Sequence, residues 1–244
     1  MSDNLLNRHR IGIIAGSGPE AGLDLWNKVL DENRSCLGLK YRGDIDAPDV
    51  TIRSSPKLGY SMDLNEHFNE LKDHFEKVAL ELASVVDYFG IACHTLHCFS
   101  NSIKELRLDA GFISISQVCI DHVSRKSLRK IGVLATSYTL NFKRYSFFSD
   151  LQNKCDLELP LDPEQVDDLI RRIKLVGANR DTRHRLLNII EQFESEVLLL
   201  ACTELPLLLP MKTPGHQFID PTRLLAHELV KLSFAPTKES VWRA

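Results

Sequence analysis

Two stretches 120 positions apart share one pattern, a glycine, three apolar residues and two small residues: Gly12-Ile13-Ile14-Ala15-Gly16-Ser17 and Gly132-Val133-Leu134-Ala135-Thr136-Ser137. A short apolar run that ends in turn-forming residues is typical of a buried strand. Four further apolar runs, at 50–53, 85–92, 112–115 and 197–201, have the same character. Together with 11–15 and 131–135, they predict the strands of the fold.

Helical segments lie between these runs. Residues 64–86 place Leu64, Phe68, Leu71 and Phe75 on one face, and similar spacing occurs at 21–33, 162–176 and 182–193. Strands that alternate with helices indicate βαβ units and parallel sheets. We therefore predict an α/β fold.

A second internal repeat supports two related halves. The segment Ile91-Ala92-Cys93-His94-Thr95 resembles Leu200-Ala201-Cys202-Thr203, at an offset of 109 positions. Because both repeats occur in the same order, we predict two pseudo-symmetric α/β lobes, each with a mainly parallel sheet flanked by helices, over residues 1–115 and 116–221. Ligands of such sheets bind beyond the carboxyl ends of the strands, so an active-site cleft between the lobes is expected. The alternative is that the two cysteines occupy unrelated strand ends.

The composition excludes several classes of protein. The chain has 244 residues, 43% apolar and 26% charged, with a net charge of −3 and no basic block, so nucleic acid is not an expected partner. The first ten residues are polar, and no apolar run approaches the roughly 20 residues that cross a bilayer. We therefore expect a cytoplasmic protein without a membrane partner.

Six cysteines in a chain of this size do not indicate a disulfide framework. Cys36, Cys98, Cys119 and Cys155 have no polar motif around them and are interpreted as small apolar residues. Cys93 and Cys202 differ, because each ends a strand and precedes a predicted helical segment, 96–106 in the first case. A helix N-terminus lowers the pKa of a thiol, so both positions suit an activated cysteine.

Two such thiols facing one carbon atom could invert its configuration. A thiolate on one face would remove a proton and a thiol on the other face would return one. The carbanion formed between these steps requires hydrogen-bond donors. Hydroxyl groups and backbone amides at strand ends could supply them, although such residues are also common helix caps. The available donors are Ser17, Gly18, Ser55, Thr95, Thr136, Thr139 and Thr203.

Over nearly its whole length the chain resembles the aspartate/glutamate racemase superfamily, and most closely its aspartate racemase branch. The residues that carry the resemblance are Ile11 to Ala21 for the opening glycine motif, Ser55-Pro56 for an Asn-Pro element, Ala92-Cys93-His94-Thr95-Leu96-His97 and Ala201-Cys202-Thr203-Glu204-Leu205-Pro206 for the two catalytic motifs, Gly132 to Thr139, and Ile219-Asp220-Pro221-Thr222.

The resemblance implies a racemase without pyridoxal phosphate, other cofactor or metal, in which Cys93 and Cys202 form the acid/base pair. It also implies that the C-terminal helix, within 222–244, completes the first lobe, and that the protein is a homodimer. The substrate would be an amino acid or dicarboxylate, most closely aspartate. The implied substrate-binding residues are Ser17, Gly18, Ser55, His94, Thr95, Thr136, Ser137, Thr139, Thr203 and Glu204, with Lys174 and Arg53 as candidate cations.

Several residues depart from the branch's pattern. His94 stands where the family usually has Asn, and an imidazole ordinarily titrates near neutrality. Ser61 stands where an Arg typically reads the side-chain carboxylate of the substrate, so Arg53 or Lys57 would have to supply that charge. Lys174 matches a second cationic position of the family, or is a solvated lysine at a helix end.

Other functions remain open. Glutamate, broad-specificity and hydantoin racemases and maleate isomerase use paired cysteines of the same kind, and a binding protein that has lost catalysis could keep the cleft. The cluster Cys93-His94-x-x-His97-Cys98 also resembles a metal site, but the sequence offers no second Cys/His pair to complete a tetrahedral set.

Overall fold

The computed structural model describes residues 8–140, 146–209, 213 and 215–235. Within these ranges the chain divides into two compact units, neither of which is continuous in sequence. The first unit contains residues 8–92, 99–114 and 225–235, and the second contains 93–98 and 115–224. The predicted lobes also include 1–7 and 236–244, which lie outside the described residues, and their boundaries stay a prediction.

The first unit is built on a parallel sheet with strand order β2-β1-β3-β4. Its strands are β1 (Ile11–Ala15), β2 (Val50–Ser54), β3 (Tyr88–Ile91) and β4 (Gly111–Ile113). Its helices are α1 (Pro19–Leu37), α2 (Leu64–Ala83), α3 (Ser100–Glu105) and the part of α8 (Pro221–Ser233) that follows Leu224, with 3₁₀ turns at Gly38–Lys40, Asp44–Asp46 and Pro56–Asp63.

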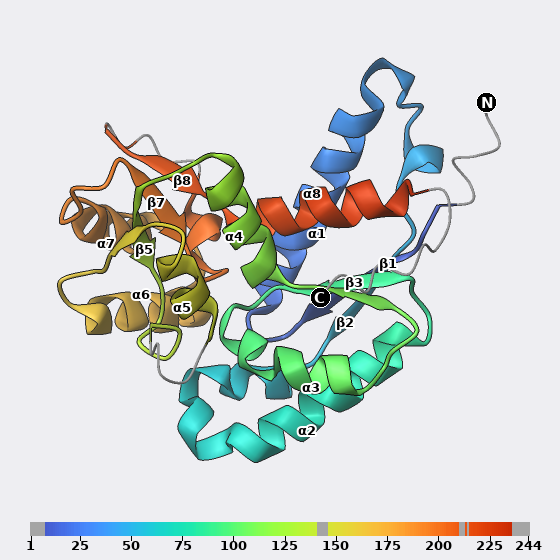
Figure 1. Cartoon of the computed structure of the whole chain (residues 1–244), viewed down its shortest axis with the longest axis horizontal. Helices are drawn as coiled ribbons and strands as arrows, with labels where there is room; N and C mark the ends of the chain where they lie inside the picture. Colours follow the sequence, from blue (N-terminus) through green and yellow to red (C-terminus); the bar gives the residue numbers. More distant parts are fainter. Residues whose placement is uncertain (1–7, 141–145, 210–212, 214, 236–244) are drawn as a thin grey trace. The chain divides into compact units, whose positions relative to one another are not determined.

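Glycines in two neighbouring strands let helices approach both faces of this sheet. A Cβ atom on Gly12 would lie 2.7 Å from Phe89 Cβ and 2.9 Å from Leu82 Cδ2 of α2. A Cβ atom on Gly90 would lie 2.9 Å from both methyl carbons of Leu225 in α8. Helices α2 and α8 therefore pack on opposite faces of the sheet, and α8 crosses α1 on its face (Figure 1).

The second unit repeats this topology. Its strands β5 (Lys130–Leu134), β6 (Asp156–Glu158), β7 (Val197–Leu200) and β8 (Gln217–Ile219) are parallel and follow the order β6-β5-β7-β8. In both sheets the strand that comes first in the unit lies between the second and the third, and the fourth lies at the edge next to the third. Its helices are α4 (Ile115–Arg125), α5 (Ser146–Gln152), α6 (Pro163–Val176) and α7 (Arg180–Ile190), with 3₁₀ turns at Thr95–Phe99 and Leu205–Leu208.

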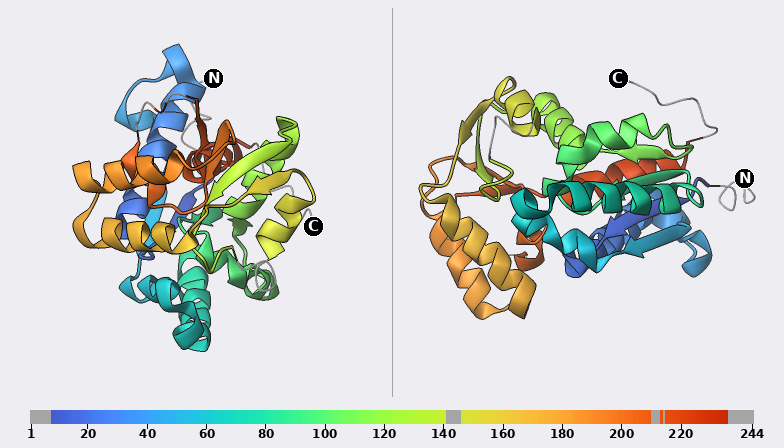
Figure 2. Two further views of the ribbon diagram at one scale, coloured as in Figure 1. Left: turned by 90° about the vertical axis from the view of Figure 1, so that its left-hand side faces the viewer. Right: turned by 90° about the horizontal axis from the view of Figure 1, so that it is seen from below.

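The two faces of the second sheet have separate cores. Alternate residues of β5 and β7, among them Val133 and Leu199, pack with apolar residues of α4 and α5. On the other face Gly132 lies against Phe193, just after α7, and α6 and α7 run side by side (Figure 2). Caps fix where these helices begin, because Asp162 accepts the Glu164 amide and Asn179 forms a capping box with Thr182.

Two parallel sheets flanked by helices confirm the predicted fold class. Differences from the sequence prediction are local. Strands β6 and β8 were not predicted, because each has only three residues and includes charged or polar side chains. The helix predicted at 96–106 is a 3₁₀ turn followed by the six-residue α3. Among the described helices, none combines the length and apolar character needed to cross a membrane.

Candidate active site

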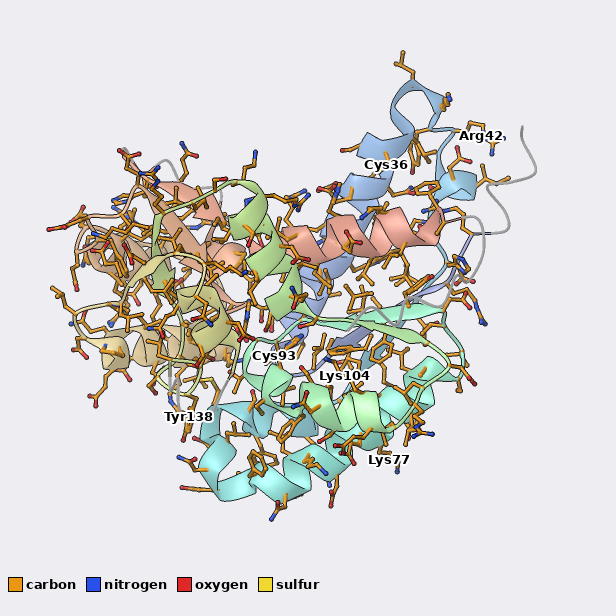
Figure 3. The ribbon with its side chains drawn as sticks, in the orientation of Figure 1. Cys36, Arg42, Lys77, Cys93, Lys104 and Tyr138 are labelled. Carbon is orange, nitrogen blue, oxygen red and sulfur yellow. The ribbon has the colours of Figure 1, made fainter. Side chains whose placement is uncertain are left out.

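Cys93 and Cys202 occupy equivalent places, two residues beyond the central strands β3 and β7. Both are buried, with 5% of Cys93 and 8% of Cys202 exposed. The segment 93–98 groups with the second unit although β3 belongs to the first, so the two cysteines lie in one unit. Figure 3 marks Cys93 among the side chains.

Cys202 contacts a buried carboxylate. Its Sγ donates a hydrogen bond of 2.9 Å to Glu204 Oε2, while Glu204 Oε1 accepts a charge-assisted hydrogen bond from Lys174 Nζ on α6. The Glu204 side chain is only 4% exposed and that of Lys174 is 21% exposed. Thiol, carboxylate and ammonium thus form one continuous chain of contacts.

These contacts reverse the expectation for the Cys202 thiol. Burial raises its pKa well above the ordinary value, and the Glu204 carboxylate raises it further, while Lys174 acts in the opposite direction. The predicted lowering by a helix N-terminus is wrong here. Only a four-residue 3₁₀ turn, Leu205–Leu208, follows Cys202, and it begins after the acidic Glu204.

Lys174 interacts with both cysteines. Burial alone would lower its pKa, but Glu204, Cys202 and Cys93 act together to raise it, so the ammonium stays charged. The interpretation of Lys174 as a solvated lysine is therefore wrong. Its charge links the segments that follow β3 and β7.

Two histidines beside Cys93 are held neutral. The peptide N–H of Ile115 donates to His97 Nε2 at 3.1 Å, which leaves the ring proton on Nδ1 to be donated to the Cys93 carbonyl at 2.7 Å. Burial lowers the pKa of His97 to about 4, and burial together with His97 lowers that of His94 to about 3. The expectation that His94 titrates near neutrality is thus wrong.

The Cys/His cluster is not arranged as a metal site. Both ring nitrogens of His97 are engaged by the backbone. In the described part of the chain, no three His, Cys, Asp or Glu side chains lie where they could hold a metal ion.

Three predicted threonines come together in the second unit. Thr139 Oγ1 lies 2.8 Å from Thr136 Oγ1 and 3.3 Å from Thr95 Oγ1, and all three side chains are buried. Next to them Ser137 donates its amide and hydroxyl to Asp167 of α6, at 3.0 and 2.5 Å. The role of Asp167 was missed, because no motif links a helical acid to a loop 30 residues earlier.

The remaining predicted residues lie in the first unit, at the ends of β1 and β2. Ser17 Oγ is 2.5 Å from Ser61 Oγ, and Ser55 Oγ is 2.6 Å from Nε2 of His74, which the sequence did not single out. The backbones are close as well, since a Cβ on Gly16 would lie 2.1 Å from the Ser55 carbonyl oxygen. Gly18 is the N-cap of α1, with a φ of 122° that favours glycine.

The two cations expected near these hydroxyls are paired elsewhere. Arg53 Nε donates to Glu81 of α2 at 3.1 Å, and Lys57 Nζ lies 3.8 Å from Glu70. The Arg53 side chain is 43% exposed and that of Lys57 is 63% exposed. In this structure the strand ends of the first unit therefore present neutral hydroxyl groups.

Solved structures of racemases share this fold. An aspartate racemase of Picrophilus torridus matches with a TM-score of 0.78 and 22% identity, over 92% of this chain and 94% of that chain. An aspartate racemase homologue of Pyrococcus horikoshii OT3 matches with a TM-score of 0.72 and 20% identity, over 92% and 99% of the two chains.

A sequence relative and a family description agree with the fold. The chain is 25% identical to the broad specificity amino-acid racemase RacX of Bacillus subtilis (strain 168), over 92% of this chain and 98% of that protein. Residues 44–229 match the sequence model of the Asp/Glu/Hydantoin racemase family. The chain therefore belongs to the Asp/Glu/Hydantoin racemase family.

Proposed function

We propose that the protein is an amino-acid racemase in which Cys93 and Cys202 are the two bases, with aspartate as its principal substrate. One observation carries the proposal: the chain belongs to a racemase family and has a buried cysteine beyond each of two equivalent strands. The influence of both thiols on Lys174 supports a common site.

In the proposed reaction, one cysteine acts as a thiolate and removes the proton from Cα of the amino acid. The thiol of the other cysteine donates its proton to the opposite face of the carbanion, which inverts the centre. Proton number and charge are conserved, because the thiolate becomes a thiol and the thiol a thiolate. The chemistry is complete with two thiols, so the proposal assigns no role to pyridoxal phosphate.

The surrounding groups suit a carbanion intermediate. Lys174 keeps a positive charge in a buried setting, where its attraction for developing negative charge is stronger than in water. Thr95 follows Cys93 by two residues, and its hydroxyl group lies with those of Thr136 and Thr139 in one cluster of hydrogen-bond donors. Neutral His94 can donate without adding charge.

A second candidate is a racemase of broad specificity. Ser61 hydrogen-bonds to Ser17, and Arg53 and Lys57 pair with glutamates of α2. In the described structure neither cation is therefore available to a substrate carboxylate at the ends of β1 and β2. A site of this composition accepts uncharged side chains as well as a carboxylate. The name of the Bacillus relative agrees with this reading.

Proton exchange in deuterated water tests the proposal. The protein is incubated with L- or D-aspartate, loss of the Cα proton is followed by NMR, and the enantiomers are separated by chiral chromatography. We expect exchange together with inversion. A panel of glutamate and neutral amino acids separates the two candidate specificities, and absence of exchange with every substrate contradicts the proposal.

Serine variants test the thiol assignment. Cys93→Ser and Cys202→Ser should each abolish racemisation, because a hydroxyl is far less acidic than a thiol. Cys36→Ser is the matched control, since Cys36 is exposed and lies in the first unit. Full racemase activity in either of the first two variants would show that the reaction does not use both thiols.

A further inference from the structure

Both cysteines are buried, and the sulfur of Cys202 has a charged partner. Cys202 Sγ lies 2.9 Å from Glu204 Oε2, in contact with a carboxylate that is itself almost fully buried. A carboxylate at this distance accepts a hydrogen bond from a thiol and repels a thiolate. The geometry therefore favours a proton on the Cys202 sulfur.

Lys174 does not cancel this preference. It binds Glu204 through the other carboxylate oxygen, Oε1, so the anionic oxygen nearer to the sulfur stays directed at Cys202. Burial and Glu204 together raise the pKa of Cys202 despite the opposing effect of Lys174. Among the described residues, the charged groups with the largest effect on the thiol are Glu204 from its own segment and Lys174 from α6.

A two-base racemase needs one thiolate and one thiol at the start of each turnover. Resting on the proposed function, we propose that Glu204 is a positioning residue that keeps Cys202 protonated in the resting enzyme, so that Cys202 is the thiol and Cys93 the thiolate of the pair. Lys174 then has a double role: it fixes Glu204 and stabilises the negative charge on Cys93.

The proton balance follows from this assignment. In one direction the Cys93 thiolate takes the Cα proton while Cys202 gives its own, which leaves a Cys202 thiolate beside the Glu204 carboxylate. That product form is disfavoured by repulsion between the two anions. It returns to the resting form when Cys202 regains a proton and Cys93 loses one, either through solvent or in a turnover of the opposite enantiomer.

Alkylation by iodoacetamide distinguishes the two thiols, because only a thiolate reacts appreciably. The full-length protein without substrate is treated at pH 7, and the rate at each cysteine is measured by peptide mass spectrometry. We expect Cys93 to react at least about tenfold faster than Cys202, since one pKa unit changes the thiolate fraction about tenfold. Their exposures of 5% and 8% are too similar to produce such a difference.

Two variants should move the Cys202 rate in opposite directions. Glu204→Gln removes the negative charge and keeps the shape, so Cys202 should react about tenfold faster or more. Lys174→Met leaves the carboxylate uncompensated, so Cys202 should react more slowly than in the parent. Exposed Cys36 is the internal reference, and buried Cys119 reports unfolding, since it becomes reactive only if the core opens.

Faster reaction at Cys202 than at Cys93 in the parent protein would overturn the proposal. So would an unchanged Cys202 rate in Glu204→Gln with Cys119 still protected. If Glu204→Gln unfolds, Lys174→Met decides, because a faster Cys202 rate there contradicts the role of Glu204. The readout needs no substrate, so a failed racemisation assay with the expected alkylation pattern would refute the proposed function alone.

Discussion

Lowering the pH from 7 to 5 should destabilise the second unit through two buried imidazoles. The pKa of His94 is lowered to about 3 and that of His97 to about 4, against 6.5 for a free side chain. Between pH 6.5 and these values the unfolded chain binds protons that the folded protein excludes. The contribution of these neutral imidazoles to the free energy of unfolding is therefore complete above pH 6.5 and is lost as the pH falls towards 4.

The size of the effect follows from the same values. At pH 5 a side chain with a pKa of 6.5 is almost fully charged in the unfolded chain, whereas both imidazoles stay neutral in the folded protein. Each then contributes a loss of about 2 kcal/mol, or about 4 kcal/mol together. Asp46, Asp87 and Glu158 have pKa values lowered from 4.5 or less, so their contribution falls mainly below this window.

Urea titrations followed by circular dichroism at pH 8, 7, 6 and 5 measure this dependence. His94→Asn removes one of the two groups without adding a charge, so its loss of stability between pH 7 and 5 should be smaller by about 2 kcal/mol. Parent and variant should run parallel between pH 8 and 7. An equal loss of unfolding free energy in both proteins between pH 7 and 5 would refute the claim that His94 is neutral in the folded protein.

Three further substitutions, one of them with a matched control, test the packing and the loop after β5. Gly12→Ala should lower the free energy of unfolding by about 1–3 kcal/mol, because the new Cβ would lie 2.7 Å from the Cβ of Phe89 in the neighbouring strand. Gly59→Ala is the control: its new Cβ would lie 3.7 Å from the nearest atom, so the free energy of unfolding should change by less than about 0.5 kcal/mol. Equal effects of the two substitutions in urea titrations would argue against close packing at β1. Leu225→Ala should cost about 2–5 kcal/mol in the same assay, since this fully buried side chain covers β3, and a loss below about 1 kcal/mol would show that α8 contributes little to the first unit. Asp167→Ala removes two hydrogen bonds from Ser137, so KM for the racemised amino acid should rise by about threefold or more. Circular dichroism should show that the variant is folded. An unchanged KM would remove Ser137 from the proposed substrate-binding residues.

The sequence predicted the fold class and six of the eight described strands because glycines and apolar runs act locally. The repeat at Gly12 and Gly132 marks strands that occupy the same position in two sheets of identical order. Cys93 and Cys202 follow from the same logic, since each directly extends a buried strand. Short strands such as β6 lack such a signal, because three residues carry no periodicity.

The charge state of the site could not be predicted in this way. Glu204 and Lys174 are 30 residues apart, and their contact joins α6 to the segment that follows β7. The sign of the change in the Cys202 pKa depends on burial and on that carboxylate, neither of which is visible in motif spacing. His97 is similar, since its role depends on a contact with the Ile115 amide at the start of α4.

The division of the chain into discontinuous units has a consequence for biosynthesis. Leu225, Leu229 and Val230 of α8 are fully buried in a unit whose sheet is complete more than a hundred residues earlier. A ribosome therefore releases the whole second unit before the first can close its apolar surface. The nascent chain therefore carries this sheet face without α8 while more than a hundred further residues are synthesised, and apolar surface exposed in this way favours misfolding and aggregation.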